Sequence, residues 1–117
     1  MRTPTPQDEA LTWWRDTLAG RDPPTHDEPQ CGFFKRRYGT GPWLPARIWL
    51  DSPADPATGE LLGDEKKLCE IDGKLFDALD QWLWLAKHPV GTAEYKFLAA
   101  DRAWAREHLT GPSGQFI

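Results

Sequence analysis

The residues best suited to bind another molecule lie between Gly32 and Asp51, where aromatic rings are interleaved with basic side chains. Residues 31–51 carry four basic residues and one acidic residue, a net charge of +3, whereas residues 52–80 carry three basic and eight acidic residues, a net charge of −5. Such rings can stack on bases or fill protein pockets, and the cations can bind phosphates or carboxylates. Because the formal net charge of the chain is −4, we expect a local contact and no chain-wide nucleic-acid surface.

The candidate binding residues carry both signs of charge. Acidic groups of residues 52–80 could meet a basic surface on a partner, while Trp and Arg side chains of the basic segment anchor the contact. The acidic run from Asp64 to Asp80 is also explained as a solvated face that keeps an edge strand from pairing with other chains. The candidates are Lys35, Arg36, Arg37, Tyr38, Trp43, Arg47, Trp49, Asp64 and Glu65.

Metal and nucleophile chemistry has weaker support. His26, Cys31, Cys69 and His88 are possible ligands, but they lack the close paired spacing of metal sites, so we expect neither a metal nor a cofactor. Either cysteine could pair with His88 as a nucleophile. The carboxylates that could serve general acid–base catalysis are Glu60, Asp64, Glu65 and Glu70. No local signature supports these readings, and we expect that the chain is not an enzyme. A site assembled only by folding would leave no such signature.

A β-hairpin is predicted to position the basic and aromatic residues. Residues 31–38 and 43–51 are the predicted strands, and residues 39–42 are the turn. The second strand alternates between an apolar face for the core and a mixed face opposite it. The apolar face consists of Leu44, Ala46, Ile48 and Leu50, and the other face consists of Trp43, Pro45, Arg47 and Trp49.

The pattern leaves open which residues of the first strand join Arg47 on the outer face. If Tyr38 pairs with Trp43, this face gains Phe34, Arg36 and Tyr38; if Tyr38 pairs with Leu44, it gains Phe33, Lys35 and Arg37. Also open is whether the outer face is covered. Trp13 or Trp14 of an N-terminal helix could cover it and make a second core, with Arg47 reaching out to solvent.

An N-terminal helix is predicted over residues 6–19, capped by Thr5, ended by Gly20 and buried through Leu11, Trp14 and Leu18. Residues 21–30 contain three prolines and are expected to form an extended connection.

A second hairpin is predicted over residues 66–76, with Asp72-Gly73 as its tight turn, after a loop at residues 51–60. Two helices follow within residues 77–108. The first begins at Asp77 and runs to about residue 87; the second begins at Thr92. Their predicted buried stripes are Leu79, Trp82, Leu83 and Ala86 in the first and Ala93, Phe97, Ala100 and Trp104 in the second.

These elements predict one α+β domain over residues 1–117. Its small antiparallel sheet, of two hairpins and three to five strands, packs with three helices in the order α-β-β-β-β-α-α. Residues 110–117 are expected to form a loose tail. The longest apolar run, residues 82–86, is far shorter than the roughly 20 residues of a membrane span, and the start of the chain has no apolar run typical of a signal peptide. With two isolated cysteines, we expect a cytoplasmic protein with reduced thiols.

Two runs, Cys31-Gly32-Phe33-Phe34-Lys35-Arg36-Arg37 and Gly41-Pro42-Trp43-Leu44-Pro45-Ala46-Arg47-Ile48-Trp49, resemble small uncharacterised accessory proteins of tailed phages and prophages of Proteobacteria. The likeness extends through residues 69–73 and 103–108 and covers roughly residues 29–108. This resemblance implies a small, acidic, non-enzymatic protein in a bacterial host cell. Such proteins bind host or phage macromolecules, and inhibitors of CRISPR effectors belong to that class.

The first hypothesis is therefore a non-enzymatic accessory protein, a monomer or homodimer, that binds a host protein or nucleoprotein complex and inhibits a nucleic-acid-processing defence system. A nucleic-acid-binding module that uses the hairpin directly is the alternative. A small enzyme whose site is assembled by folding is the third hypothesis.

Overall fold

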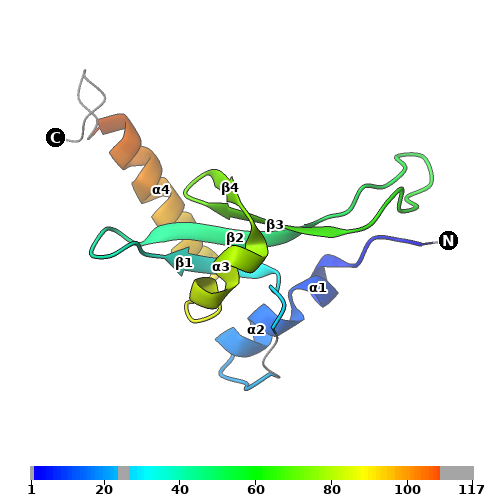
Figure 1. Cartoon of the computed structure of the whole chain (residues 1–117), viewed down its shortest axis with the longest axis horizontal. Helices are drawn as coiled ribbons and strands as arrows, with labels where there is room; N and C mark the ends of the chain where they lie inside the picture. The colour runs from blue at the N-terminus through cyan, green and yellow to red at the C-terminus, as the bar shows by residue number, and fades with distance from the viewer. Residues whose placement is uncertain (1, 24–26, 109–117) are drawn as a thin grey trace.

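The computed structural model describes residues 2–23 and 27–108 and confirms an α+β fold (Figure 1). Its four strands form one antiparallel sheet in the order β1-β2-β3-β4. The described residues form these elements in chain order: α1 (Gln7–Ala10), α2 (Thr12–Leu18), β1 (Gly32–Arg36), β2 (Leu44–Asp51), β3 (Lys66–Ile71), β4 (Lys74–Phe76), α3 (Ala78–Leu85) and α4 (Thr92–His108).

The sheet lies between α3 and α4, which pack on opposite faces (Figure 1). The face toward α3 carries the main core, built on Phe34, Ala46, Ile48, Cys69 and Ile71. Burial of these side chains removes apolar surface from water and is the main stabilisation of the fold. The predicted alternation of β2 is confirmed here, because Ala46 and Ile48 are fully buried on this face.

The N-terminal helix differs from its prediction because it breaks at Leu11, whose backbone leaves the helical region (φ −93°, ψ 6°). The result is two short helices, so the described residues contain four helices instead of three. Thr5 does not cap the first of them; its hydroxyl donates to Glu65 at 2.7 Å. Leu11 and Trp14 are buried as predicted, but Leu18 at the end of α2 is 42% exposed.

The first hairpin has neither of the two predicted registers. Leu44 lies opposite Arg36, and Arg47 lies opposite Phe33, so Phe33 and Lys35 share the outer face with Arg47. This is the face expected from pairing Tyr38 with Leu44, but the strands are shifted by two residues. Consequently β1 ends at Arg36, and Arg37 and Tyr38 belong to the turn.

The second hairpin is confirmed at its predicted position. Asp72 and Gly73 form its turn with φ angles of 51° and 83°, the left-handed values that a tight hairpin turn requires. Asp77 then caps α3 by accepting hydrogen bonds from the backbone N–H groups of Leu79 and Asp80.

The outer edge of β1 is covered by residues 88–90 and by Trp14. The backbone N–H of Lys35 donates to the His88 carbonyl, and that of Val90 donates to the Phe33 carbonyl, both at 3.0 Å. The indole N–H of Trp14 lies 3.0 Å from the carbonyl oxygens of Phe33 and Val90. These bonds leave little of the β1 edge free to pair with another strand.

Both C-terminal helices are rotated away from their predicted orientation. In α3 the buried residues are Ala78, Trp82 and Leu85, while Leu79 and Leu83 of the predicted stripe are each 65% exposed. The large Trp82 ring decides this rotation, because it packs edge-on against Phe34 at a centroid distance of 5.7 Å.

In α4 the whole predicted stripe is exposed: Ala93, Phe97, Ala100 and Trp104. The helix instead turns Tyr95, Leu98, Ala99, Arg102 and Ala105 inward. Contacts at both ends of the helix fix this rotation. The Tyr95 ring packs on the Phe33 ring at a centroid distance of 4.7 Å. Guanidinium nitrogens of Arg102 and Arg106 lie 3.4 and 2.6 Å from the carboxylate oxygens of Asp72.

Candidate interaction surface

The basic residues of the β1–β2 hairpin gather around aromatic rings. On the outer side of its turn, the Lys35 ammonium lies 4.6 Å from the Trp43 ring centroid and the Arg37 guanidinium lies 5.7 Å from it. The His88 ring meets the Trp43 ring edge-on, with 5.0 Å between the ring centroids. Arg37 also donates to the carbonyl oxygens of Thr40 and Gly41, so it holds the turn in place.

On the other side of the sheet, Arg36 is held between two rings. Its guanidinium carbon lies 4.3 Å from the Tyr38 ring centroid and 4.7 Å from that of Trp84. One guanidinium nitrogen donates to the Arg37 carbonyl at 2.7 Å, while the buried Nε lacks a hydrogen-bond partner among the described residues. The two ring contacts restrict a side chain that otherwise has many rotamers.

Trp84 was missing from the predicted site because sequence spacing places it on α3 and not on the hairpin. The pattern did contain a signal: Trp84 lies outside the apolar stripe predicted for that helix, so a large ring was left without a place in the core. In the structure it is 45% exposed and joins the hairpin to α3.

Helix α3 also exposes two apolar side chains besides Trp84. Leu79 and Leu83, one helical turn apart, are each 65% exposed, and both lie on α3 with Trp84. A groove of about 570 Å³ lies beside Leu79 and reaches Phe76 and Lys67. We refer to Arg36, Tyr38, Leu79, Leu83 and Trp84 together as the α3 surface.

Arg47 and Trp49 lie on the opposite face of the sheet. The Arg47 guanidinium stacks 4.2 Å from the Trp49 ring centroid and binds Glu70 on the neighbouring strand, with Nε 3.2 Å from Oε1. The alternative in which the N-terminal helix covers this face holds only at its β1 edge, where the Trp14 ring meets the Phe33 ring edge-on at a centroid distance of 5.5 Å. Trp13 packs on the core face against Phe34 and Trp82, and α4 covers another part of the Arg47 face.

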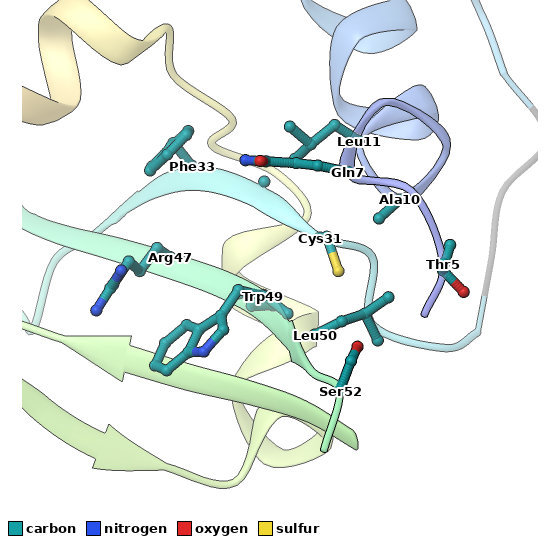
Figure 2. Close-up of a pocket in the computed structure, with 12 residues that line it drawn as sticks. Thr5, Gln7, Ala10, Leu11, Cys31, Phe33, Arg47, Trp49, Leu50 and Ser52 are labelled. Atoms are coloured by element: carbon teal, nitrogen blue, oxygen red, sulfur yellow. The ribbon is translucent and has the colours of Figure 1, made fainter. Parts of the chain in front are cut away.

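A pocket of about 360 Å³ lies beside Arg47, between the N-terminal segment and the β1–β2 pair (Figure 2). Figure 2 shows Arg47 and Trp49 at one end of it, Thr5 and Ser52 at the other, and Cys31 between them. Burial raises the pKa of the Cys31 thiol, and a raised pKa keeps a thiol protonated and a poor nucleophile. The pocket therefore lacks an activated cysteine.

Cys69 is likewise unsuited to nucleophilic chemistry. Burial in the core, with smaller effects of the nearby Asp77 and Glu70 carboxylates, raises the pKa of its thiol to about 11. The thiolate population at neutral pH is therefore negligible. Within residues 2–23 and 27–108, no three His, Cys, Asp or Glu side chains come together in a group that could hold a metal ion. His26 lies outside the described residues.

The two acidic candidates lie at the other end of the sheet. Asp64 and Glu65 precede Lys66, which pairs with Asp51 at the far end of β2 from Leu44. At about 3.3 Å per residue, the eight-residue β2 separates them from the hairpin turn by about 25 Å. The acidic and basic candidates therefore do not form one continuous contact.

The Glu65 side chain connects the N-terminal segment to the loop after β2. Its carboxylate accepts hydrogen bonds from the Ser52 hydroxyl at 2.6 Å and from the Thr5 hydroxyl and backbone N–H at 2.7 and 3.1 Å. These bonds, that of Ser52 foremost, lower the pKa of Glu65. Asp64 is almost fully exposed and lies 3.8 Å from Arg2.

Seven of the nine residues predicted from the sequence thus lie in three separate groups. The groups are Lys35 with Arg37 and Trp43, Arg36 with Tyr38, and Arg47 with Trp49.

None of the helices in the described residues is long and apolar enough to cross a membrane. No family model, no curated protein and no solved structure matches this chain.

Proposed function

We propose that this chain is a non-enzymatic binding protein that engages a protein partner through the α3 surface. The observation that carries the proposal is the stacking of Arg36 on the rings of Tyr38 and Trp84, together with two leucines of α3, the helix of Trp84, that are each 65% exposed. Arg, Tyr and Trp are the residue types that dominate binding energy in protein interfaces. Arg36 is already fixed in one conformation, which lowers the entropy lost on binding.

The surroundings of this surface favour a protein over a nucleic acid. Asp77 and Asp80 lie at the start of α3, close to Leu79, and would repel a phosphate backbone. Two of the four hairpin cations are also neutralised within the chain, Lys35 by Glu94 and Arg47 by Glu70. Aliphatic side chains such as Leu83 add affinity for an apolar protein surface but little for a phosphate backbone.

For the partner, we propose a host macromolecular complex in the bacterial cytoplasm, with inhibition of a nucleic-acid-processing defence system such as a CRISPR effector as the consequence. Two observations support this choice. The sequence resembles phage and prophage accessory proteins, and residues 52–80 carry a net charge of −5. An acidic region can compete for the basic surface on which such a complex holds its nucleic acid.

A phage-plating assay tests the proposal directly. In cells with an active defence system, expression of the wild-type chain should restore plating of the targeted phage, whereas Leu83→Asp and Arg36→Ala should not. Each substitution removes an anchor of the α3 surface, and we expect at least about tenfold weaker partner binding.

Leu62→Asp is the matched control, because Leu62 is 67% exposed and lies in the loop that precedes β3. This variant should act like the wild type. If Leu83→Asp and Arg36→Ala inhibit as well as the control, the α3 surface is not the binding site.

Direct binding of single-stranded nucleic acid is the second candidate, favoured by the two cations next to Trp43. A titration of labelled single-stranded DNA and RNA with wild type and Trp43→Ala at low and moderate salt tests it. Salt-sensitive binding at micromolar protein that Trp43→Ala removes would support this second function. Its absence would leave the protein partner as the proposed target.

A further inference from the structure

Helix α4 has two apolar faces, and the fold uses only one of them. The inward face, formed by Tyr95, Leu98, Ala99, Arg102 and Ala105, packs toward β1 and β2. The ion pairs of Arg102 and Arg106 with Asp72 fix the helix further along, so its rotation is determined by contacts at both ends. The opposite face consequently points to solvent.

This solvent face carries four apolar residues in a regular pattern, Ala93, Phe97, Ala100 and Trp104, which we call the α4 stripe. Its spacing of four, three and four residues is that of the seam between two paired helices. Phe97 is 68% exposed, and Trp104 is 52% exposed although one side of its ring stacks on His108 at a centroid distance of 4.6 Å. Two large rings exposed on one helix face are unusual on a surface that binds no other molecule.

The order of residue sizes along the stripe identifies the partner. The stripe reads small, large, small, large, so its reverse reads large, small, large, small. If a second, antiparallel copy is placed about a two-fold axis midway between Phe97 and Ala100, Phe97 faces Ala100 of the second copy and Trp104 faces Ala93 of the second copy. Every ring then meets an alanine, the size complementarity that fills a helix interface without gaps.

We therefore propose that the chain forms a two-fold symmetric dimer in which the α4 stripes of two copies pair antiparallel. The contact is isologous, because each copy contributes the same four residues. The sheet and α3 of each copy lie on the far side of its own α4, away from the axis (Figure 1). The dimer therefore leaves the α3 surface free, and this inference does not depend on the proposed function.

A parallel pair of helices fits less well. It would place Phe97 against Phe97 and Ala100 against Ala100, so the wide and narrow layers would not pack at one common spacing. Its one advantage would be an ion pair between Lys96 and Asp101 of the second copy, and exposed ion pairs contribute little. In the antiparallel pair Asp101 approaches Glu94 of the second copy, and the two carboxylates repel each other. Lys35 reduces this repulsion, because its Nζ lies 3.3 Å from Oε2 of Glu94 in the same chain.

The size of the contact implies a reversible dimer. Stable interfaces bury about 1,200–2,000 Å² in total, and one pair of four-residue stripes covers less than that. We expect a dissociation constant on the order of 100 µM, so the dimer forms at high local concentration and dissociates on dilution.

Sedimentation equilibrium between 10 µM and 1 mM tests the dimer. The wild-type mass should rise from one chain toward two over this range. Phe97→Asp and Ala100→Glu should remain monomeric, with at least a tenfold increase in the dissociation constant, because symmetry places each new charge in the contact twice. Both positions are exposed, so far-ultraviolet circular dichroism should show an unchanged fold.

Leu62→Asp, an exposed position away from α4, and Leu79→Asp on the α3 surface are the controls and should dimerise like the wild type. A wild-type chain that stays monomeric to 1 mM would overturn the proposal and would mean that other residues or another partner cover the stripe. A dimer that Leu79→Asp abolishes and Phe97→Asp does not would also overturn it.

Disulfide cross-linking tests the orientation. When Phe97→Cys and Ala100→Cys chains are mixed and oxidised, the antiparallel dimer should give a cross-linked heterodimer. Ala100→Cys alone should cross-link poorly, because the two cysteines would be about a helical turn apart along the axis. Efficient cross-linking of Ala100→Cys alone would mean a parallel pair and overturn the antiparallel arrangement. Cys31 and Cys69 are buried and should not compete.

Discussion

At the scale of single residues, the cations of the β1–β2 hairpin are engaged by the protein's own side chains. Arg47 binds Glu70, Lys35 binds Glu94, and Arg36 stacks between two rings. Such contacts fix the geometry of a surface but reduce its long-range attraction for anions. This distinction cannot be seen in the amino-acid composition, and it is the reason why we propose a protein partner before a nucleic acid.

Gly32 permits a close approach that no other residue would allow. A Cβ atom at this position would lie 2.5 Å from two carbon atoms of the Trp14 ring. We expect Gly32→Ala to lower the free energy of unfolding by about 1–3 kcal/mol, because the buried indole would have to move away from its two carbonyl partners. Urea denaturation monitored by fluorescence measures this loss.

Gly91→Ala is the control for that substitution, because a Cβ at Gly91 would have no neighbour within 4 Å. Its free energy of unfolding should stay within about 0.5 kcal/mol of the wild type. A Gly32→Ala variant as stable as Gly91→Ala would show that Trp14 is not packed against this glycine.

Glu65 should make the stability of the protein depend on pH. Because its folded-state pKa is lowered, its contribution is fully present above the unfolded-state pKa of about 4.3 and is lost as the pH falls through the folded-state pKa. Urea denaturation of wild type and Glu65→Gln should therefore show a larger stability difference at pH 7 than at pH 3. Asp64→Asn, at the exposed neighbouring position, is the control; an equal difference at both pH values for Glu65→Gln would contradict the assignment.

At the scale of elements, the rotation of a helix about its own axis decides what the protein displays. Both C-terminal helices carry apolar residues on more than one face, so their sequences permit several rotations. In α3 the packing of Trp82 on Phe34 selects one of them and exposes Leu79 and Leu83. The α3 surface and the α4 stripe both follow from such choices.

The start of α3 depends on the Asp77 cap. The Asp77 carboxylate accepts hydrogen bonds from the backbone N–H groups of Leu79 at 2.8 Å and Asp80 at 3.2 Å. We expect Asp77→Ala to lower the free energy of unfolding by about 1 kcal/mol, and Asp77→Ser to retain most of the stability because its hydroxyl can accept the same bonds. Thermal denaturation of the three proteins tests this; equal losses in both variants would rule out a capping role.

At the scale of the whole molecule, one core joins elements from distant parts of the chain. Trp14 from α2, Phe34 from β1, Ile48 from β2, Cys69 from β3 and Trp82 from α3 belong to a single buried cluster. Among the described elements, β4 and α4 contribute no residue to this cluster. The two proposed interaction surfaces, on opposite sides of the sheet, thus lie on either side of the same core.

This arrangement predicts one cooperative unfolding transition. Three of the seven tryptophans, Trp13, Trp14 and Trp82, lie in or against the core cluster, so the fluorescence change of buried tryptophan reports the core. Far-ultraviolet circular dichroism reports the helices, including α4. We expect the two urea or thermal transitions to coincide. If α4 melted first, the circular dichroism signal would fall before the fluorescence changed, and α4 would be a separate, less stable unit.

The sequence by itself determined the order and type of most elements, because these depend on local signals. Alternation in residues 44–50 predicted β2 and its core face, Asp72-Gly73 predicted the second hairpin, and Asp77 predicted the start of α3. Each signal acts within a few residues of the chain. The break at Leu11 was not predicted, because the apolar spacing continues through it.

Only the tertiary structure decided the hairpin register and the rotations of α3 and α4. Register and rotation are set by contacts between residues far apart in sequence, such as Lys35 with His88, Phe34 with Trp82 and Tyr95 with Phe33. The sequence therefore identified Arg36 and Tyr38 as candidates but could not join them to Trp84. The sequence also identified the residues of the α4 stripe but assigned them to the core, because apolar spacing alone does not distinguish a buried helix face from an exposed one.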